Sequence, residues 1–344
     1  MGYTFSNTEK TKKKASEYET YAALYMLGVY PQKEKMEYIL VDSFNDVSSA
    51  TANINEIYDV QSKGYKSVSQ EQIGRFLYTL FKNYQTDFPF KEFIIFLETI
   101  DTKFLINASK VFSFSNFNDN DKERVKKGLH KEIAKRDKIS FDENLEKQID
   151  SFLSNVVFVI NQFTKQDAVK KLIPIKNTTT FPDTFYISIF DEIRDKQSSL
   201  KNIFIENFEI EYPSEVLKFN KHISRRELNG LLINRVIGCE LFKNNLPFGF
   251  LPYLQTIHPN EDLEDIIQKC NSELALMFFD KNNKRNIWKL CFHIIDLIYS
   301  NPKNKSEEIL HLLKPDLLIK AKISEESAIY LISRIQEGQK NANS

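Results

Sequence analysis

The chain has 344 residues, of which 42% are apolar and 27% charged, and its 47 basic and 47 acidic residues give no net charge. This length allows two domains with sizeable cores, and the composition is that of a globular protein. With zero net charge there is no overall positive field to favour nucleic acid, so binding to DNA requires a local basic patch.

Localisation follows from what the sequence lacks. No apolar run reaches 18 residues, so we expect no membrane span. The beginning of the chain has no apolar signal region, and we expect a cytoplasmic protein. The three cysteines are widely spaced and the five histidines are scattered, which predicts buried thiols and no zinc site.

The first predicted element is a helix over residues 15–27, after a polar and basic lead-in over residues 1–14. Apolar side chains recur at spacings of three and four along this helix, and Gly28 stands where a C-terminal cap belongs. Glu17 and Glu19 also lie on it. Each is either an accessory acid of a site or a surface glutamate.

Two strands are predicted next, over residues 38–47 and 57–63. Their polar residues fall on alternate positions: Asp42 and Asp46 in the first, and Asp59, Gln61 and Lys63 in the second. Side chains of a strand alternate between its two faces, so each of these sets shares a face. Strand interiors disfavour Asp and Lys, so the polar stripe calls for an explanation. If the strands pair as a hairpin, both sets converge on one area of the sheet.

The residue types in this cluster suit metal-assisted phosphodiester hydrolysis. Mg2+ prefers a few hard oxygen ligands, which Asp46, Gln61 and Asp42 offer, and takes a further contact from a substrate phosphate. Lys63 is suited to hold the attacking water and to offset charge on the phosphate, with Asp59 as a supporting acid. Alternatively, the stripe is an ordinary solvated face of an antiparallel sheet.

The rest of the chain divides into an α/β part and a helical part. Ser69 and Gln72 predict a capping box for a helix over residues 69–84. Strands are predicted over residues 93–97 and 111–114, and a polar break at 116–121 predicts a domain boundary. Beyond the break the pattern is mostly helical, with helices predicted over residues 122–136, 261–279, 286–299 and 324–336.

An acid followed on the next strand by (acid or amide)-x-Lys is the pattern of the PD-(D/E)xK nucleases, and here 61 − 46 = 15 residues separate the two. With its flanking helices, the Asp-Val-Gln-Ser-Lys strand resembles the DNA endonuclease domain of CD-NTase-associated anti-phage effectors and of nucleases that partner HerA-type ATPases. The resemblance covers roughly residues 15–120. It implies a restriction-endonuclease-like α/β core there, a mixed sheet flanked by helices. A mostly α-helical C-terminal domain, residues 121–344, then serves assembly or partner binding.

The resemblance also implies an activity. It implies a metal-dependent endonuclease of bacterial anti-phage defence that cleaves double-stranded DNA with Mg2+, or with Mn2+. Control by homo-oligomerisation or by a HerA-type ATPase is implied in the same way. The chain departs from the commonest family pattern at Gln61, where a Glu or Asp usually stands, and an amide is a weaker ligand. This leaves room for Asp59 to be the working acid, or for an inactive site. The alternative function is a catalytically inactive nuclease-like subunit that serves as an assembly or DNA-docking module.

Overall fold

The structure is a computed structural model that describes residues 2–5, 13–139, 141–175, 180–242, 245–259 and 262–342. The chain forms two compact units. The sheet unit comprises Met1–Leu172 and Tyr186–Arg225, and the helical unit comprises Ile173–Phe185 and Arg226–Ser344.

The sheet unit is built on a mixed sheet that has seven strands within the described residues, in the order β6-β7-β5-β4-β3-β2-β9. The strands are β2 (Met36–Val41), β3 (Val47–Thr51), β4 (Ile57–Lys63), β5 (Phe90–Leu97), β6 (Val111–Ser113), β7 (Val156–Ile160) and β9 (His222–Ser224). Strands β4, β5 and β7 run parallel, while the other neighbours pair antiparallel. The predicted mixed α/β sheet is confirmed.

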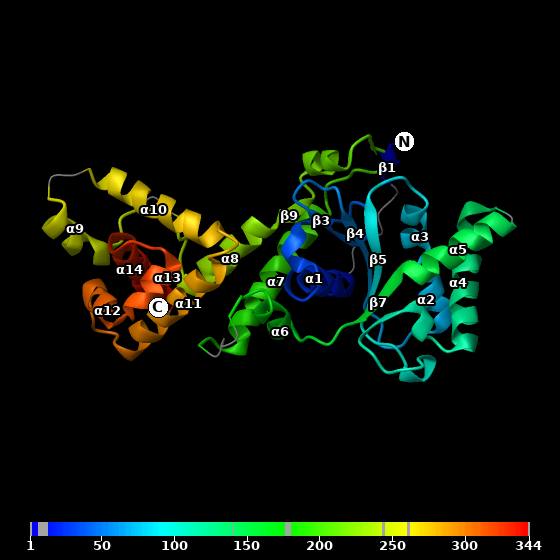
Figure 1. The fold of residues 1–344 in the computed structure, drawn as a ribbon, viewed down its shortest axis with the longest axis horizontal. Coiled ribbons are helices and arrows are strands. Elements are labelled where there is room, and N and C mark those ends of the chain that lie inside the picture. Colours follow the sequence, from blue (N-terminus) through cyan, green and yellow to red (C-terminus); the bar gives the residue numbers. More distant parts are fainter. Residues whose placement is uncertain are drawn as a thin grey trace. The chain divides into compact units, whose positions relative to one another are not determined.

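Helices cover both faces of this sheet (Figure 1). One face carries α2 (Gln70–Phe76), α3 (Tyr78–Tyr84), α4 (Asp119–Asp137) and α5 (Glu143–Asn155). Phe93, Ile95 and Leu97 of β5 enter the apolar core beneath these helices. The other face carries α1 (Lys13–Gly28), α6 (Lys165–Lys170) and α7 (Asp183–Leu200). There Tyr25 of α1 packs on Phe96, with ring centroids 5.7 Å apart.

The predicted helix over residues 69–84 is two helices, which meet at Leu77. Its capping box is confirmed, since Ser69 Oγ accepts from Gln72 N at 3.3 Å and Gln72 Oε1 accepts from Ser69 N at 2.9 Å. Helices α2 and α4 cross in backbone contact at two glycines. A Cβ on Gly74 would lie 1.9 Å from the Val125 carbonyl oxygen, and one on Gly128 would lie 2.1 Å from that of Glu71.

The helical unit confirms the expected mostly helical C-terminal region. Its helices are α8 (Arg225–Ile237), α9 (Leu251–Ile257), α10 (Leu263–Phe279), α11 (Lys284–Ser300), α12 (Ser306–Leu312), α13 (Pro315–Ala321) and α14 (Glu325–Ala342). Trp288 and Tyr330 are buried in its core, and buried Arg334 donates to the Asn245 carbonyl oxygen at 2.6 Å. Within the part of the chain that the structure describes, none of the helices has the length and apolar character needed to cross a bilayer.

The boundary between the two units does not fall near residue 120, as predicted. The sheet unit continues to Leu172 and also takes in Tyr186–Arg225. Strand β7, in the region expected to be helical, pairs with β5 inside the sheet, and β9 pairs with β2 at its edge. The expected lead-in over residues 1–14 also differs in part. Its described beginning, β1 (Tyr3–Thr4), pairs with β8 (Glu209–Ile210), whereas residues 1 and 6–12 lie outside the described part.

Candidate active site

The register of a hairpin places Asp46 beside Gln61. Strand β3 runs antiparallel to β4 with Val47 opposite Val60, so Asp46, one residue earlier, lies across from Gln61. The predicted strand over residues 38–47 is wrong in its extent, because β2 ends at Val41 and residues 42–46 form the connection to β3.

Asp42 and Asp46 therefore do not share a strand face. Asp42 opens the connection with a φ of 48°, a left-handed conformation that bends the chain away from β2. Asp46 closes the connection, immediately before β3. The two residues still lie side by side, because Asp42 N donates a hydrogen bond of 3.3 Å to the Asp46 carbonyl oxygen.

The Asp46 carboxylate lies at the centre of the candidate site, in contact with Gln61, Ser62 and Lys63. Its Oδ2 accepts hydrogen bonds from the Gln61 side-chain amide and from the Ser62 main-chain N–H, the latter at 3.0 Å. The Lys63 ammonium lies 3.6 Å from the same oxygen, and the Lys63 and Asp46 side chains are 16% and 21% exposed. The structure thus brings Asp46, Gln61 and Lys63 together at the carboxyl end of β4, where solvent reaches Asp46 and Lys63 while Gln61 is buried.

The Lys63 side chain lies against the ring of Phe76, which in turn stacks on Tyr65. Its ammonium lies 5.7 Å from the centroid of the Phe76 ring on α2, and Tyr65 stacks on Phe76 at 5.5 Å. A cation over an aromatic ring is attracted to its face. These contacts limit the positions open to the Lys63 side chain and keep its charge near Asp46.

Asp59 lies on the same face of β4 but deep in the protein, with no exposed surface. It accepts hydrogen bonds from Asn83 Nδ2 at 2.7 Å, Ser48 Oγ at 3.0 Å and Asn45 Nδ2 at 3.5 Å. Burial raises its pKa from 3.8 to about 6, although the three donors oppose that shift. The expected role of Asp59 as a supporting acid is corrected, because a carboxylate without exposed surface cannot contact a substrate.

Two further carboxylates beside the site are each paired with a lysine. Glu19 on α1 forms an ion pair with Lys201, and Asp42 lies 3.5 Å from the Lys221 ammonium. Burial is the main cause that raises the pKa of Glu19 to about 7, and the charges of Asp46 and Asp42 act in the same direction. Burial likewise raises the pKa of Asp42.

The two candidate glutamates of the first helix have different surroundings. Glu19 is almost fully buried beside the site. Glu17 instead pairs with Lys165 at 3.2 Å. Sequence analysis left both alternatives open for each residue, and the structure favours a place near the site for Glu19 only.

Several residues around the site were missed. Thr79 and Asn83 of α3 contact Gln61 and Asp59, and their i, i+4 spacing beside an apolar stripe was a usable signal. Lys201 and Lys221 follow α7, more than 130 residues beyond the hairpin. No local sequence pattern marks a lysine that reaches a site from so far along the chain.

The oxygen atoms at the site suit a hard divalent cation that keeps most of its water. Among the described residues, no group of three or more His, Cys, Asp or Glu side chains is arranged to hold a metal ion. The side chains that offer oxygen ligands are Asp46 and Gln61, although the Gln61 oxygen accepts from Thr79 and its nitrogen faces Asp46 in this structure. Mg2+ commonly binds through one or two protein oxygens, with water and a substrate phosphate completing its shell.

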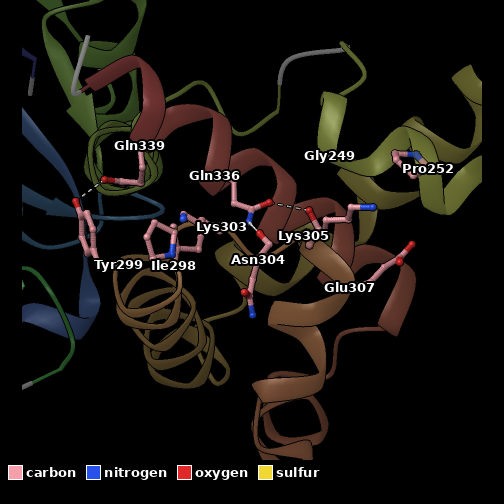
Figure 2. Close-up of a pocket in the computed structure, with 12 residues that line it drawn as sticks. Gly249, Pro252, Ile298, Tyr299, Lys303, Asn304, Lys305, Glu307, Gln336 and Gln339 are labelled. Atoms are coloured by element: carbon pink, nitrogen blue, oxygen red, sulfur yellow. Dashed lines mark hydrogen bonds between the residues drawn. The ribbon is translucent and has the colours of Figure 1, made fainter.

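The helical unit contains a pocket of about 600 Å3 between the α11–α12 connection, α14 and the start of α9 (Figure 2). Some of its polar groups already bond to one another. Tyr299 donates to Gln339 Oε1 at 2.6 Å, and Gln336 donates to the Asn304 carbonyl oxygen at 2.8 Å. The pocket is well formed but presents no reactive cluster comparable to that around Asp46.

Comparisons of the chain with protein-family models, with curated proteins and with solved structures give no match. The function is therefore argued from the geometry of the site.

Proposed function

We propose that this chain is a divalent-metal-dependent DNA endonuclease that hydrolyses phosphodiester bonds. The observation that carries the proposal is the convergence of Asp46, Gln61 and Lys63 at the carboxyl end of β4. A carboxylate, an amide and an ammonium meet there, and the carboxylate and the ammonium are partly exposed to solvent. This combination supplies a cation ligand and a fixed positive charge side by side, as phosphodiester hydrolysis requires.

Asp46 and Gln61 would hold the cation, Mg2+ or Mn2+, through the carboxylate and the amide oxygen. The bound cation supplies Lewis-acid polarisation of the scissile phosphate. Asp42 is a weaker candidate ligand, because its carboxylate is paired with Lys221. The Ser62 N–H and the Gln61 amide fix the direction of the Asp46 carboxylate.

Lys63 would act on the attacking water and on the phosphate. Its ammonium donates hydrogen bonds from Nζ, orients the water for in-line attack and offsets negative charge that builds on the phosphate. Because Lys63 lies 3.6 Å from Asp46 Oδ2, a phosphate bound beside Asp46 comes within reach of both groups. Glu19 and Asp42, each neutralised by a lysine, add little repulsion against the substrate.

The biological setting that we propose is bacterial anti-phage defence, with control by self-association or by a HerA-type ATPase. This part rests on the sequence resemblance around residues 15–120. A nuclease must be restrained in the cell, and we assign the contacts that restrain it to the helical unit. The alternative, a catalytically inactive subunit, is supported by Gln61 in place of a carboxylate.

Cleavage of supercoiled plasmid tests the proposal. The wild-type chain is expected to cut in Mg2+ or Mn2+ and to stop when EDTA is added. Asp46→Ala and Lys63→Ala are each expected to reduce cleavage by about a hundredfold or more, because each removes a group that acts on the reacting phosphate. Metal-dependent cutting that survives both substitutions would contradict this site.

A further inference from the structure

The Gln61 side chain presents its amide nitrogen, not its oxygen, to Asp46. Nε2 donates to Asp46 Oδ2, and Oε1 accepts a hydrogen bond of 2.7 Å from Thr79 Oγ1 on α3. An amide binds a cation only through its oxygen. In this arrangement the oxygen of Gln61 points away from the carboxylate with which it would share a metal.

The Thr79 hydroxyl lies between two acceptors. Gln61 Oε1 is 2.7 Å from Thr79 Oγ1, and Asn45 Oδ1 is 3.2 Å away on the other side. A hydroxyl carries a single proton and two lone pairs, so it donates well to only one of these oxygens and can accept from another group. Asn45 is itself fixed, since its Oδ1 accepts from Asp46 N at 3.1 Å and its Nδ2 reaches Asp59 at 3.5 Å.

We infer that Thr79 is a positioning residue whose hydroxyl lets the Gln61 amide turn over when a divalent cation binds. A rotation of about 180° would turn Oε1 toward Asp46, and the Asp46 carboxylate and the Gln61 amide oxygen would then hold the cation together. Nε2 then donates to Thr79 Oγ1, and Thr79 redirects its own proton to Asn45 Oδ1. Every polar group keeps a partner in both states.

The cation is what selects between the two states. Without it, Gln61 Oε1 and Asp46 Oδ2 would face each other as two acceptors, so the amide keeps its nitrogen toward the carboxylate. With it, the two oxygens share a positive charge. The inference rests on the proposed function, because it assumes that Asp46 and Gln61 hold the metal. Thr79 touches neither the metal nor the substrate in this scheme.

The test is the affinity for Mn2+ alone, measured by electron paramagnetic resonance of the free ion. Thr79→Val removes the hydroxyl at nearly constant volume, whereas Thr79→Ser keeps it. We expect Thr79→Val to weaken Mn2+ binding about tenfold, because valine removes one hydrogen bond from the unliganded state, that from Thr79 to Gln61 Oε1, but two from the bound state, those with Gln61 Nε2 and Asn45. Thr79→Ser should stay within about twofold of the wild type. Thermal melting checks folding, and Thr79→Ala replaces the valine variant if that one does not fold.

The same substitutions in a Gln61→Glu background separate positioning from packing. A carboxylate has two acceptor oxygens and need not turn, so Thr79 donates the same hydrogen bond with or without the cation. Thr79→Val should then change Mn2+ affinity by less than about threefold. A tenfold loss in both backgrounds would show that Thr79 acts through packing, and no loss in either would show that the amide does not need it. Either result overturns the inference.

Failure of the proposed function gives a different result. If the wild type and Asp46→Ala bind Mn2+ equally weakly, the site holds no metal, and both proposals fall together. If Asp46→Ala abolishes Mn2+ binding while Thr79→Val and Thr79→Ser both bind Mn2+ as tightly as the wild type, the metal site stands. Only the role of Thr79 is then overturned.

Discussion

Alternation along β4 determines which way each side chain points, but not how deeply it lies. Asp59, Gln61 and Lys63 share a face as the two-residue period predicts, and the structure confirms that relation. Their depths differ, because α3 covers Asp59 and Gln61, whereas the Lys63 side chain lies beyond α3 and is 16% exposed. Asn83 therefore meets Asp59, while Lys63 reaches solvent. The helix that buries Asp59 begins more than ten residues after β4 in the sequence. The pattern of the strand alone therefore cannot predict this burial.

The depth of Asp59 gives a prediction about pH. Its pKa rises from 3.8 unfolded to about 6 folded, so the folded chain holds this proton more tightly. The free energy of unfolding therefore falls as pH increases from about 4 to about 6, by about 3 kcal/mol from this group. In Asp59→Asn that contribution is absent. Urea denaturation, followed by circular dichroism at pH 4.5 and pH 7, should show a smaller fall for the variant.

The control for this prediction is Asp87→Asn, which changes an exposed aspartate. It should keep the pH dependence of the wild type. If Asp59→Asn and the wild type lose the same stability between the two pH values, the buried carboxylate does not carry the effect.

At the scale of elements, the sequence locates helices better than strands. The long helices α1, α4, α10 and α11 match their predicted ranges closely, because an apolar stripe repeats over several turns. Strand β3 was missed, since Ser48, Ser49 and Ala50 lack alternation and are buried by their neighbours. Strand β7 was missed because it follows α5 directly, with no turn residue between them.

The crossing of α2 and α4 yields a prediction for an element. A Cβ on Gly128 would lie 2.1 Å from the Glu71 carbonyl oxygen, so Gly128→Ala must push the helices apart. We expect a loss of about 1–3 kcal/mol in unfolding free energy, as overpacking typically causes. A lower melting temperature in a thermal scan would report it.

Gly230→Ala is the matched control, because a Cβ there meets nothing within 4 Å and Gly230 also lies in a helix, α8. Alanine has the higher helix propensity, so this variant should match or exceed the wild-type melting temperature. Equal melting temperatures for the two variants would argue against a tight α2–α4 crossing.

At the scale of the whole molecule, the mixed sheet and the helical C-terminal region were predictable, but the division of the chain was not. The polar composition of residues 116–121 suggests a domain boundary. However, α4 and α5, which follow it, pack on the sheet, and β7 pairs with β5 within it. Long-range pairing of strands decides such boundaries, and a local composition shift carries no information about it.

The division predicts how fragments behave. A fragment of residues 1–120 lacks β7 and β9 and leaves β5 with an open edge, so we expect aggregation and rapid proteolysis. A fragment of residues 1–225 keeps every strand of the sheet, together with Lys201 and Lys221, and should be compact and protease-resistant. Size-exclusion chromatography with limited trypsin digestion compares them. A folded 1–120 fragment would contradict the division.

The proposed function depends on the Lys63 ammonium acting on a phosphodiester beside Asp46. The most direct measurement is plasmid cleavage in Mg2+ by Lys63→Met against Lys66→Met, since Lys66 is an exposed lysine three residues away. Both substitutions remove one positive charge and keep a long side chain. We predict that Lys63→Met abolishes cleavage while Lys66→Met cuts at close to the wild-type rate. Equal cleavage by the two variants would contradict the account.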